Sequence, residues 1–272
     1  MSKEVEKVLE DIIQKEKEKR DMITIPSGDI TRFEEVEDLD YSNAKIVFQG
    51  VEVAYSQLAM KEYFGADCDS FNVDTWKDAM EAIANGKADY AVLPIENSSA
   101  GIVSENYDLL VEYNNYIVGE QIIEIEHCLL GVPGAELSDI RTVYAHPQAL
   151  LQSARYLAGH DWQQIGMQNN AFAAKKVADE KDKSQAAIAG AFAAEIYGLQ
   201  ILQKGINDCG SNSTRFIIVT NQKIFRKDAR KISICFEVPH ESGSLYHMLS
   251  HFIYNDLNMT KIESRPIEDR DW

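Results

Sequence analysis

Short runs of β-branched and aromatic residues alternate with amphipathic helical patterns over most of this chain. Residues 45–48, 71–73 and 90–95 match strands, and helical patterns occupy residues 56–64 and 74–85. Polar or glycine-containing loops stand where these strands end. The order predicts an α/β protein with a doubly wound sheet, in which the loops at the strand ends meet at one edge and bind small ligands.

The same pattern returns after a long extended segment at residues 116–131. The strands and helices that follow it are expected at residues 142–145, 149–157, 170–178, 185–190 and 191–199. The chain then comes back through residues 206–219, which end in the apolar run Phe216-Ile217-Ile218-Val219. This path predicts two lobes with a cleft at the crossing segments, an arrangement that resembles type II periplasmic-binding proteins.

Three parts of the chain differ in character, and we take them as the predicted domains. They are an amphipathic helix and acidic linker at residues 1–44, a two-lobed domain at residues 45–222, and a partial module at residues 231–272. Within the two-lobed domain, lobe 1 covers about 45–124 and 206–222, and lobe 2 covers about 125–205. The last part follows a charged, largely basic linker at residues 221–231. It offers a strand at residues 232–238, a helix, and a second strand at residues 258–266, which is too little to close a core.

The charge balance is strongly acidic, with 44 Asp and Glu against 27 Lys and Arg and a net charge of −17. A field of that sign repels nucleic acid and anionic membranes. No apolar run approaches membrane-spanning length, and the first residues lack the apolar core of a signal peptide. The four cysteines form no Cys-x-x-Cys pair and the six histidines show no metal-ligand spacing. We therefore expect free thiols in a cytoplasmic protein without a metal or cofactor.

The stretch Asn212-Ser213-Thr214-Arg215 places four hydrogen-bonding side chains directly before the apolar strand. Polar side chains at the mouth of a rigid strand are typical of ligand sites in open α/β sheets. The same stretch also fits a polar loop that caps a turn, and the short motif alone does not separate the two interpretations.

Several segments together carry a specific resemblance. They are Gly50 to Ser56, Pro94-Ile95-Glu96-Asn97-Ser98 with Gly101 and Val103, His146-Pro147-Gln148-Ala149-Leu150, Ala186-Ala187-Ile188-Ala189, Tyr197-Gly198-Leu199 and Asn212-Ser213-Thr214-Arg215-Phe216. In this order, over about residues 45–220, they resemble the prephenate dehydratase family, which completes the phenylpyruvate skeleton in phenylalanine biosynthesis. Residues 231–266 are similar to the start of that family's regulatory ACT module.

The resemblance implies a lyase that removes carbon dioxide and hydroxide from prephenate and leaves an aromatic ring. Thr214 would then donate to the departing ring oxygen, and Arg215 would pair with a substrate carboxylate. The other substrate-binding candidates are Tyr55, Ser56, Glu96, Asn97, Ser98, His146, Gln148, Asn170, Asn212, Ser213 and Phe216. A structural ion pair is the alternative for Arg215, and a helix cap or turn is the alternative for the polar residues at strand ends.

Three positions depart from the residues usual in that family. Val53 stands in place of glycine, Asn170 in place of a small hydroxyl residue, and Gly190 in place of serine. Val53 removes backbone freedom from the first turn, Asn170 can still cap its helix, and Gly190 lacks a hydroxyl. We expect these changes to affect rate and substrate fit more than fold.

The C-terminal resemblance implies an effector site for L-phenylalanine between the subunits of a homodimer or homotetramer. Its candidate residues are Gly243, Ser244, Leu245, Glu263, Ser264, Arg265 and Pro266. Because half of the module is missing, we expect weak or absent phenylalanine feedback. Residues 1–44 are too short for the three-helix chorismate mutase of some relatives, so no mutase activity is expected.

Three alternatives to a prephenate dehydratase stay open. They are a dehydratase that prefers arogenate, a non-catalytic two-lobed binding protein, and an amino-acid-sensing or interaction protein that uses the ACT-like segment. The three departures favour a binding protein, whereas the intact Thr214-Arg215-Phe216 favours an enzyme.

Overall fold

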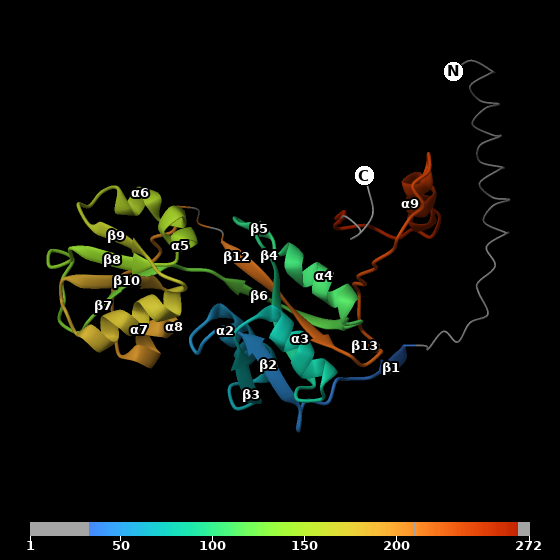
Figure 1. Cartoon of the computed structure of the whole chain (residues 1–272), viewed down its shortest axis with the longest axis horizontal. Coiled ribbons are helices and arrows are strands. Elements are labelled where there is room, and N and C mark those ends of the chain that lie inside the picture. The colour runs from blue at the N-terminus through green and yellow to red at the C-terminus, as the bar shows by residue number, and fades with distance from the viewer. Residues whose placement is uncertain (1–32, 209, 211, 266–272) are drawn as a thin grey trace, which may run out of the picture. The chain divides into compact units, whose positions relative to one another are not determined.

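The computed structural model describes residues 33–265 except 209 and 211, so the predicted N-terminal helix, Cys209 and Pro266 lie outside the described residues. The chain divides into two compact units, Met1–Asp228 and Ala229–Trp272. The first unit holds two β-sheets, each covered by helices of its own (Figure 1). The predicted two-lobed α/β architecture is therefore confirmed.

The first lobe is built on a sheet with strand order β3-β2-β4-β12-β6, and the short β5 pairs with β4. Its elements are β2 (Lys45–Gln49), α2 (Tyr55–Phe64), β3 (Asp69–Val73), α3 (Trp76–Ala84), β4 (Tyr90–Asn97), β5 (Gly101–Ile102), α4 (Ser104–Glu112), β6 (Tyr116–Glu124) and β12 (Ser213–Thr220). β2, β3 and β4 run parallel, whereas β12 is antiparallel to both β4 and β6. The apolar run predicted as the returning strand is thus inserted between β4 and β6.

Two apolar layers cover the two faces of this sheet. On one face α2 packs against Phe216 and Ile218 of β12, and on the other face α3 and α4 pack against Ile217 and Val219. The alternation of side chains along β12 creates this division, because neighbouring residues of a strand point to opposite faces. A capping box between Thr75 and Asp78 starts α3, within the predicted helical stretch 74–85.

The second lobe is a five-stranded sheet of order β11-β7-β10-β8-β9. Its elements are β7 (Cys128–Gly131), β8 (Thr142–Ala145), α5 (Pro147–Gln152), α6 (Ala154–Leu157), β9 (Gln163–Gly166), α7 (Asn170–Glu180), β10 (Gln185–Ala189), α8 (Ala191–Tyr197) and β11 (Gln200–Gln203). The central β10 contributes small buried residues, which lets α7 and α8 pack close to the sheet.

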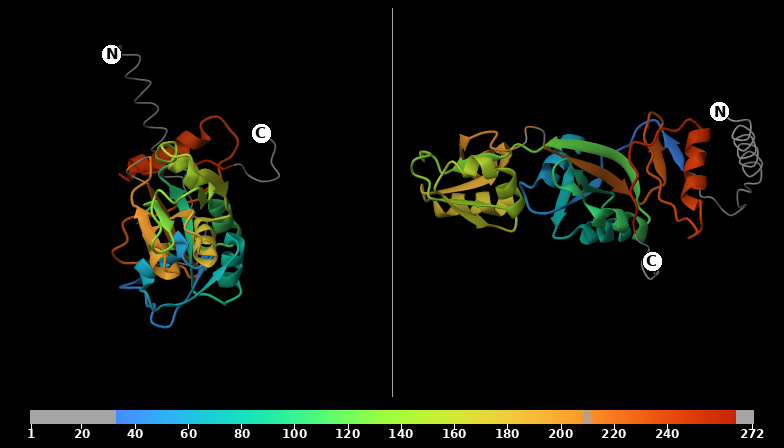
Figure 2. Two further views of the ribbon diagram at one scale, coloured as in Figure 1. Left: turned by 90° about the vertical axis from the view of Figure 1, so that its left-hand side faces the viewer. Right: turned by 90° about the horizontal axis from the view of Figure 1, so that it is seen from above.

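Two segments of chain cross between the sheets, one from β6 to β7 and one from β11 to β12 (Figure 2). Backbone hydrogen bonds join them at both ends of the crossing. The Ile125 N–H donates to the Asn212 carbonyl oxygen at 2.8 Å, and the Ile206 N–H donates to the His127 carbonyl oxygen at 3.0 Å. These bonds fix the start of β12 beside the crossing.

β4 continues past Ile95, where the sequence pattern predicts its end, although Pro94 lies within it. The strand runs to Asn97, and its register against β12 shifts between Arg215 and Phe216, so that Ile95 has no partner residue. A proline cannot donate a ladder bond, and a bulge is one of the positions where a strand tolerates it. The extra strand length carries Glu96 and Asn97 to the mouth of β12.

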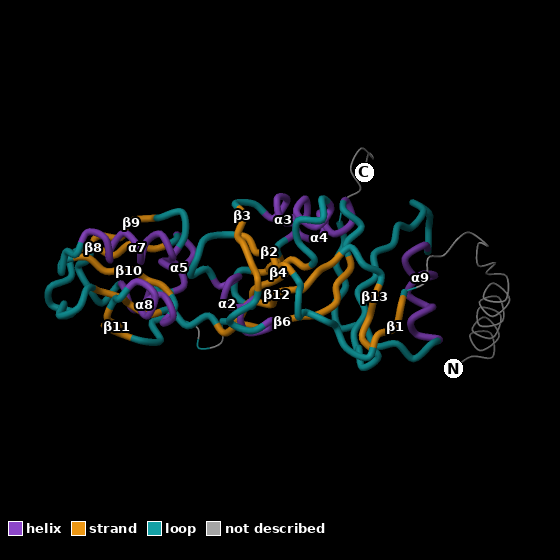
Figure 3. The backbone as a smooth tube through the Cα atoms, turned by 90° about the horizontal axis from the view of Figure 1, so that it is seen from below, coloured by secondary structure: helices purple, strands orange, loops and turns teal. Residues whose placement is uncertain are grey.

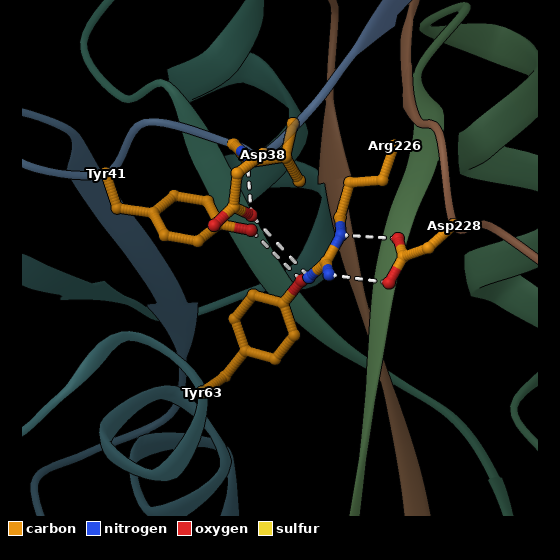
Figure 4. Close-up of polar contacts among 6 residues, drawn as sticks. Asp38, Tyr41, Tyr63, Arg226 and Asp228 are labelled. Atoms are coloured by element: carbon orange, nitrogen blue, oxygen red, sulfur yellow. Dashed lines mark hydrogen bonds and ion pairs between the residues drawn. The ribbon is translucent and has the colours of Figure 1, made fainter.

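The acidic and basic segments expected to be linkers contain a pair of short strands. β1 (Glu34–Val36) pairs in parallel with β13 (Ile224–Arg226), which corrects that expectation. Arg226 forms a two-point contact with Asp228 at 2.8 and 2.9 Å and lies 3.7 Å from Asp38 (Figure 4). Arg226 and Asp38 place opposite charges on the two segments, which favours their pairing. Neither segment shows this pairing in its own sequence.

The second unit contains one described helix, α9 (Ser244–Tyr254), and no strand among residues 229–265. The strands predicted at residues 232–238 and 258–266 are therefore wrong for the described residues, and Figure 3 shows loop on both sides of α9. Ile232 is 80% exposed and Ile262 61% exposed. Two strands without a further strand or core to cover them do not gain enough burial to form a sheet.

Candidate active site

The predicted catalytic residues lie on opposite faces of the first sheet. In the β12–β4 register Thr214 is opposite Asn97, and Arg215 is opposite Glu96. Because side chains alternate along a strand, Thr214 shares the face of α2, whereas Arg215 shares the face of α3 and α4. The two side chains therefore do not line one common surface.

Asn97 is the centre of a hydrogen-bond network on the Thr214 face. Its Oδ1 accepts from the backbone N–H groups of Ser99 (2.9 Å) and Ala100 (2.8 Å). Backbone N–H groups can only donate, so they fix which end of the amide is the oxygen. The Asn97 Nδ2 then donates to Asn212 Oδ1 at 2.8 Å and to Thr214 Oγ1 at 2.9 Å, and the Ser213 carbonyl oxygen is a third, longer acceptor at 3.1 Å.

The same network sets the direction of the Thr214 hydroxyl. Since Asn97 Nδ2 can only donate, Thr214 Oγ1 is the acceptor in their contact and keeps its own proton for another partner. Thr214 is half-buried, so the residue is not closed off from solvent. A hydroxyl anchored through its oxygen suits hydrogen-bond donation to a leaving group.

Three residues that the sequence analysis missed complete the network. Gln152, at the end of α5, donates from Nε2 to the Ser99 hydroxyl at 2.6 Å and accepts at Oε1 from Asn212 Nδ2 at 3.3 Å. His127 Nε2 lies 2.8 Å from the same Oε1. The network thus joins α5 of the second lobe to the start of β12. Only the position of Gln152, four residues after Gln148, could have drawn attention to it.

The loop before α2 packs against the second lobe. Val53 is 3% exposed and belongs to an apolar cluster with residues of β7, β10, α7 and α8. Its φ of 75° lies in the left-handed region, which is costly for a β-branched residue. The next aromatic residue, Tyr55, sets its ring edge-on to Phe192 with the centroids 5.3 Å apart. A Cβ at Gly190 would lie 2.4 Å from that Phe192 ring, so two of the three departures meet where the lobes touch.

Tyr55 also reaches the crossing segment. Its hydroxyl donates to the Glu126 carbonyl oxygen at 3.4 Å, and burial raises the pKa of its phenol well above the usual value. Tyr55 therefore stays a neutral donor at neutral pH. It stands at the first position of α2, a helix that begins without a side-chain cap. The Ala54 and Gln57 N–H groups at this end donate to backbone carbonyl oxygens, so the N–H groups of Tyr55 and Ser56 are the ones that can face an anionic ligand.

Arg215 is paired with carboxylates of the protein itself. Its Nε lies 3.2 Å from Glu96 Oε1, and its Nη1 lies 3.4 Å from Glu120 Oε2. These contacts favour the structural ion pair that the sequence analysis left open. A pocket of about 270 Å³ adjoins them on this face, and its lining residues are Glu96, Asn97, Ser98, Gly101, Ile102, Ile122, Ser213 and Arg215. The pocket does not include Thr214.

Two serine candidates, Ser56 in α2 and Ser98 after β4, bond to the backbone. The Ser56 hydroxyl donates to the Gln49 carbonyl oxygen at 2.5 Å, and Ser98 Oγ accepts from the Ser213 N–H at 2.9 Å. Phe216 is 3% exposed and belongs to the core under α2. These residues support the strand mouth, and their direct contact with substrate stays a prediction.

The candidates of the second lobe surround the start of α5. His146 caps this helix, because its Nδ1 accepts from the Gln148 N–H at 3.1 Å. The His146 N–H donates to Asn170 Oδ1 at 2.8 Å. The cap of α7 is Asn169, whose Oδ1 accepts from the Phe172 N–H, so the expectation that Asn170 caps that helix is wrong. The Asn170 side chain instead ties α7 to α5.

The candidate effector residues belong to the second unit. Gly243, with a φ of 87°, precedes α9, and Ser244 and Leu245 open that helix. Glu263, Ser264 and Arg265 lie in chain without regular secondary structure. Among the described residues no group of His, Cys, Asp or Glu side chains has the arrangement of a metal site, and no helix could span a membrane.

Comparison with known proteins decides the family. The family model for prephenate dehydratase matches residues 46–224. The chain belongs to the prephenate dehydratase family. The match covers both lobes and includes the Thr214 network, but it ends before the second unit, so an ACT module is not shown.

Curated relatives and solved structures agree with this membership. Arogenate dehydratase/prephenate dehydratase 6, chloroplastic, of Arabidopsis thaliana is 39% identical over 233 residues, which are 84% of this chain and 56% of that relative. The chain thus spans little more than half the length of this relative. The prephenate dehydratase of Arthrobacter aurescens in complex with L-Phe has 26% identity and a TM-score of 0.69, covering 82% of this chain and 76% of that one. The structure named GqqA, described as a novel type of quorum quenching acylase, has 33% identity and a TM-score of 0.71 over 83% of each chain.

Proposed function

We propose that this chain is a prephenate dehydratase that converts prephenate to phenylpyruvate, carbon dioxide and water. The observation that carries the proposal is the Thr214 hydroxyl, which accepts from Asn97 and keeps its proton for an incoming ligand. Family membership supplies the substrate class, and the network supplies the residue that acts on it.

The reaction needs little from the protein besides orientation and one donor. The ring carboxylate leaves as carbon dioxide, its bonding electron pair enters the ring, and the ring C–O bond breaks with both electrons on oxygen. The departing hydroxide takes a proton from solvent and becomes water, and the ring becomes aromatic. Thr214 would hydrogen-bond to this oxygen as its negative charge develops, which is where such a donor lowers the barrier. The start of α2 would hold an anionic group of the substrate.

Amide hydrolysis is the competing activity, because one structural neighbour is described as an acylase. A hydroxyl nucleophile requires a neighbouring base to take its proton. The partner of Thr214 is the Asn97 amide Nδ2, which donates and cannot act as a base. This contact favours a donor role for Thr214 and therefore favours the dehydratase.

The test is turnover of prephenate by the purified chain. We expect phenylpyruvate, detected by its absorbance in alkali, and a rate that rises with enzyme concentration. Absence of phenylpyruvate, with prephenate recovered unchanged, would overturn the proposal. Calorimetric binding of prephenate without turnover would instead establish the non-catalytic two-lobed binder.

Arogenate is the second candidate substrate, because the Arabidopsis relative is named for both activities. It is the amino analogue of prephenate, so the two differ at the side-chain keto group. Parallel kcat/KM measurements on the two compounds decide the preference. We expect prephenate to be the better substrate, and a higher value for arogenate would reverse that assignment.

We also propose that L-phenylalanine is at most a weak effector of this chain. We further propose that the chain acts in the cytoplasm and forms a homodimer or homotetramer. One structural neighbour is described in complex with L-Phe, which supports the effector. The described part of the second unit lacks strands, which supports weak feedback. Calorimetry with L-phenylalanine and light scattering test these two points, and tight binding would contradict the first.

A further inference from the structure

His127 is a buried titratable side chain to which the proposed reaction assigns no task. It lies in the crossing segment between β6 and β7 and is 2% exposed. Its Nε2 contacts Gln152 Oε1 at 2.8 Å, while its buried Nδ1 has no hydrogen-bond partner among the described residues. The backbone of the same residue is held as well, because the His127 N–H donates to Asn207 Oδ1 at 2.6 Å.

The direction of every hydrogen bond between His127 and Thr214 follows from fixed backbone donors. The Asn97 Oδ1 accepts backbone N–H groups, so Asn97 Nδ2 donates and Asn212 Oδ1 accepts. The Asn212 amide must then donate from Nδ2 to Gln152 Oε1. An oxygen is thus presented to the imidazole, and His127 Nε2 has to carry the proton in their contact.

The second half of the network runs back through Ser99. With its Oε1 occupied by two donors, Gln152 directs Nε2 to the Ser99 hydroxyl oxygen at 2.6 Å. The Ser99 proton then goes to an amide oxygen, either Asn97 Oδ1 at 2.8 Å or Asn212 Oδ1 at 3.2 Å. Each amide has one orientation that satisfies all its neighbours, and the imidazole N–H is the donor that secures the Gln152 amide from the second lobe.

We propose that His127 is a positioning residue for the dehydratase reaction: as a neutral imidazole protonated on Nε2, it locks the Gln152 amide and so keeps the Thr214 proton directed toward the substrate. The inference rests on the proposed function. His127 touches no substrate atom in this account and acts only through Gln152, Asn212 and Asn97.

Burial also lowers the pKa of His127, which keeps the ring neutral at neutral pH. A charged ring would need a second acceptor at Nδ1, and none is present among the described residues. The hydrogen-bond network therefore determines the tautomer of the His127 ring.

The experiment compares two substitutions of His127 with a control in the same lobe. His127→Met removes the Nε2 donor and keeps an apolar side chain, whereas His127→Gln places an amide N–H near the former Nε2. The control is His160→Met, because His160 stacks on Trp162 and belongs to no part of the network. For each variant the measurements are kcat and KM for prephenate, and the unfolding temperature.

We expect His127→Met to lower kcat roughly 10- to 100-fold with KM changed little, since a misdirected donor costs about that much. His127→Gln should recover most of the rate, and His160→Met should keep the wild-type kcat. If wild type turns prephenate over and His127→Met does so equally fast, the positioning role is wrong while the proposed function stands. If wild type shows no turnover, the proposed function fails first.

A spectroscopic measurement covers the case in which His127→Met does not fold. Nitrogen-15 NMR of the wild-type imidazole should show a neutral ring protonated on Nε2 near neutral pH. A ring protonated on Nδ1, or one carrying both protons, would overturn the inference without any variant. Equal losses of kcat in His127→Met and His127→Gln would also overturn it, because an N–H donor would then make no difference.

Discussion

The two faces of β12 place neighbouring residues of one motif in different surroundings. On the α2 face, the Thr214 hydroxyl oxygen accepts from the neutral Asn97 amide, which leaves the hydroxyl proton for another partner. On the α4 face, Arg215 forms ion pairs with the carboxylates of Glu96 and Glu120, which neutralise its charge. Residues that are adjacent in a motif therefore need not share a site, because consecutive side chains of a strand point to opposite faces of the sheet. We therefore expect the chemistry on the first face and mainly stability on the second.

The substitution Asn97→Asp should have the largest effect on this contrast. The oxygen that accepts from Ser99 and Ala100 is kept, but Nδ2 becomes an oxygen that can only accept. The Thr214 hydroxyl would then donate its hydrogen bond to the new carboxylate, and it would no longer be free to donate to the substrate. We expect kcat to fall about 10²- to 10³-fold, within the range of a lost general-acid contact. Steady-state prephenate kinetics measure it.

The matched control for that variant is Asn43→Asp, which adds the same charge at an exposed loop position. It should leave kcat unchanged. An Asn97→Asp enzyme with a rate within about threefold of wild type would show that the network does not orient the reacting proton.

Removing the charge on the other face should change stability more than rate. Arg215→Met loses both ion pairs but keeps a long side chain over the pocket wall. Because the partners are partly exposed, we expect a loss of about 1 kcal/mol or less in the free energy of unfolding. Urea denaturation measures this, and kcat should stay within about tenfold of wild type. A loss of rate as large as that of Asn97→Asp would return Arg215 to the substrate site.

The strained residue of the loop before α2 offers a smaller test on the Thr214 side. Val53→Gly and Val53→Ala both lose the buried branched side chain, but only glycine accepts a φ of 75° without cost. We expect the glycine variant to be more stable than the alanine variant by about 1 kcal/mol. Thermal unfolding compares them, and a more stable alanine variant would mean that the loop relaxes on substitution.

The smallest expected effect concerns the pH dependence of stability. Because the folded protein lowers the pKa of His127, the unfolded chain binds the proton first as the pH falls below the ordinary histidine value of 6.5. The stability linked to this group is therefore full at higher pH and is lost as the pH decreases. Between neutral pH and pH about 5, wild type should lose more stability than His127→Gln. Equal slopes for the two proteins would contradict this.

The central elements of both sheets could be predicted from the sequence, because buried strands such as β4, β10 and β12 are continuous apolar runs. The edge strands β9 and β11 escaped prediction, since each is rich in glutamine and only partly buried. Pattern alone also could not show that the two C-terminal segments predicted as strands form no strand among the described residues. A segment forms a strand only where neighbouring strands supply hydrogen bonds and packing, and its own residues do not reveal whether such neighbours exist.

The candidate site was predictable only in part, for a similar reason. Thr214 and Asn97 stand out as polar residues at strand ends, and they are hydrogen-bonded to each other. Gln152 and His127 do not stand out, because their role arises from a contact across the two lobes. Arg215 looked like a ligand until the register placed Glu96 opposite it. Long-range pairing decides these cases, and a motif contains no information about it.

The most direct test of the account is the ratio of kcat between Thr214→Ser and Thr214→Val at saturating prephenate. Serine keeps a hydroxyl that Asn97 Nδ2 can hold, and valine keeps the shape without it. We expect the serine enzyme to retain a substantial part of the wild-type rate and the valine enzyme to be about 10²- to 10⁴-fold slower. Equal rates for the two variants would contradict the claim that this hydroxyl assists the departing oxygen.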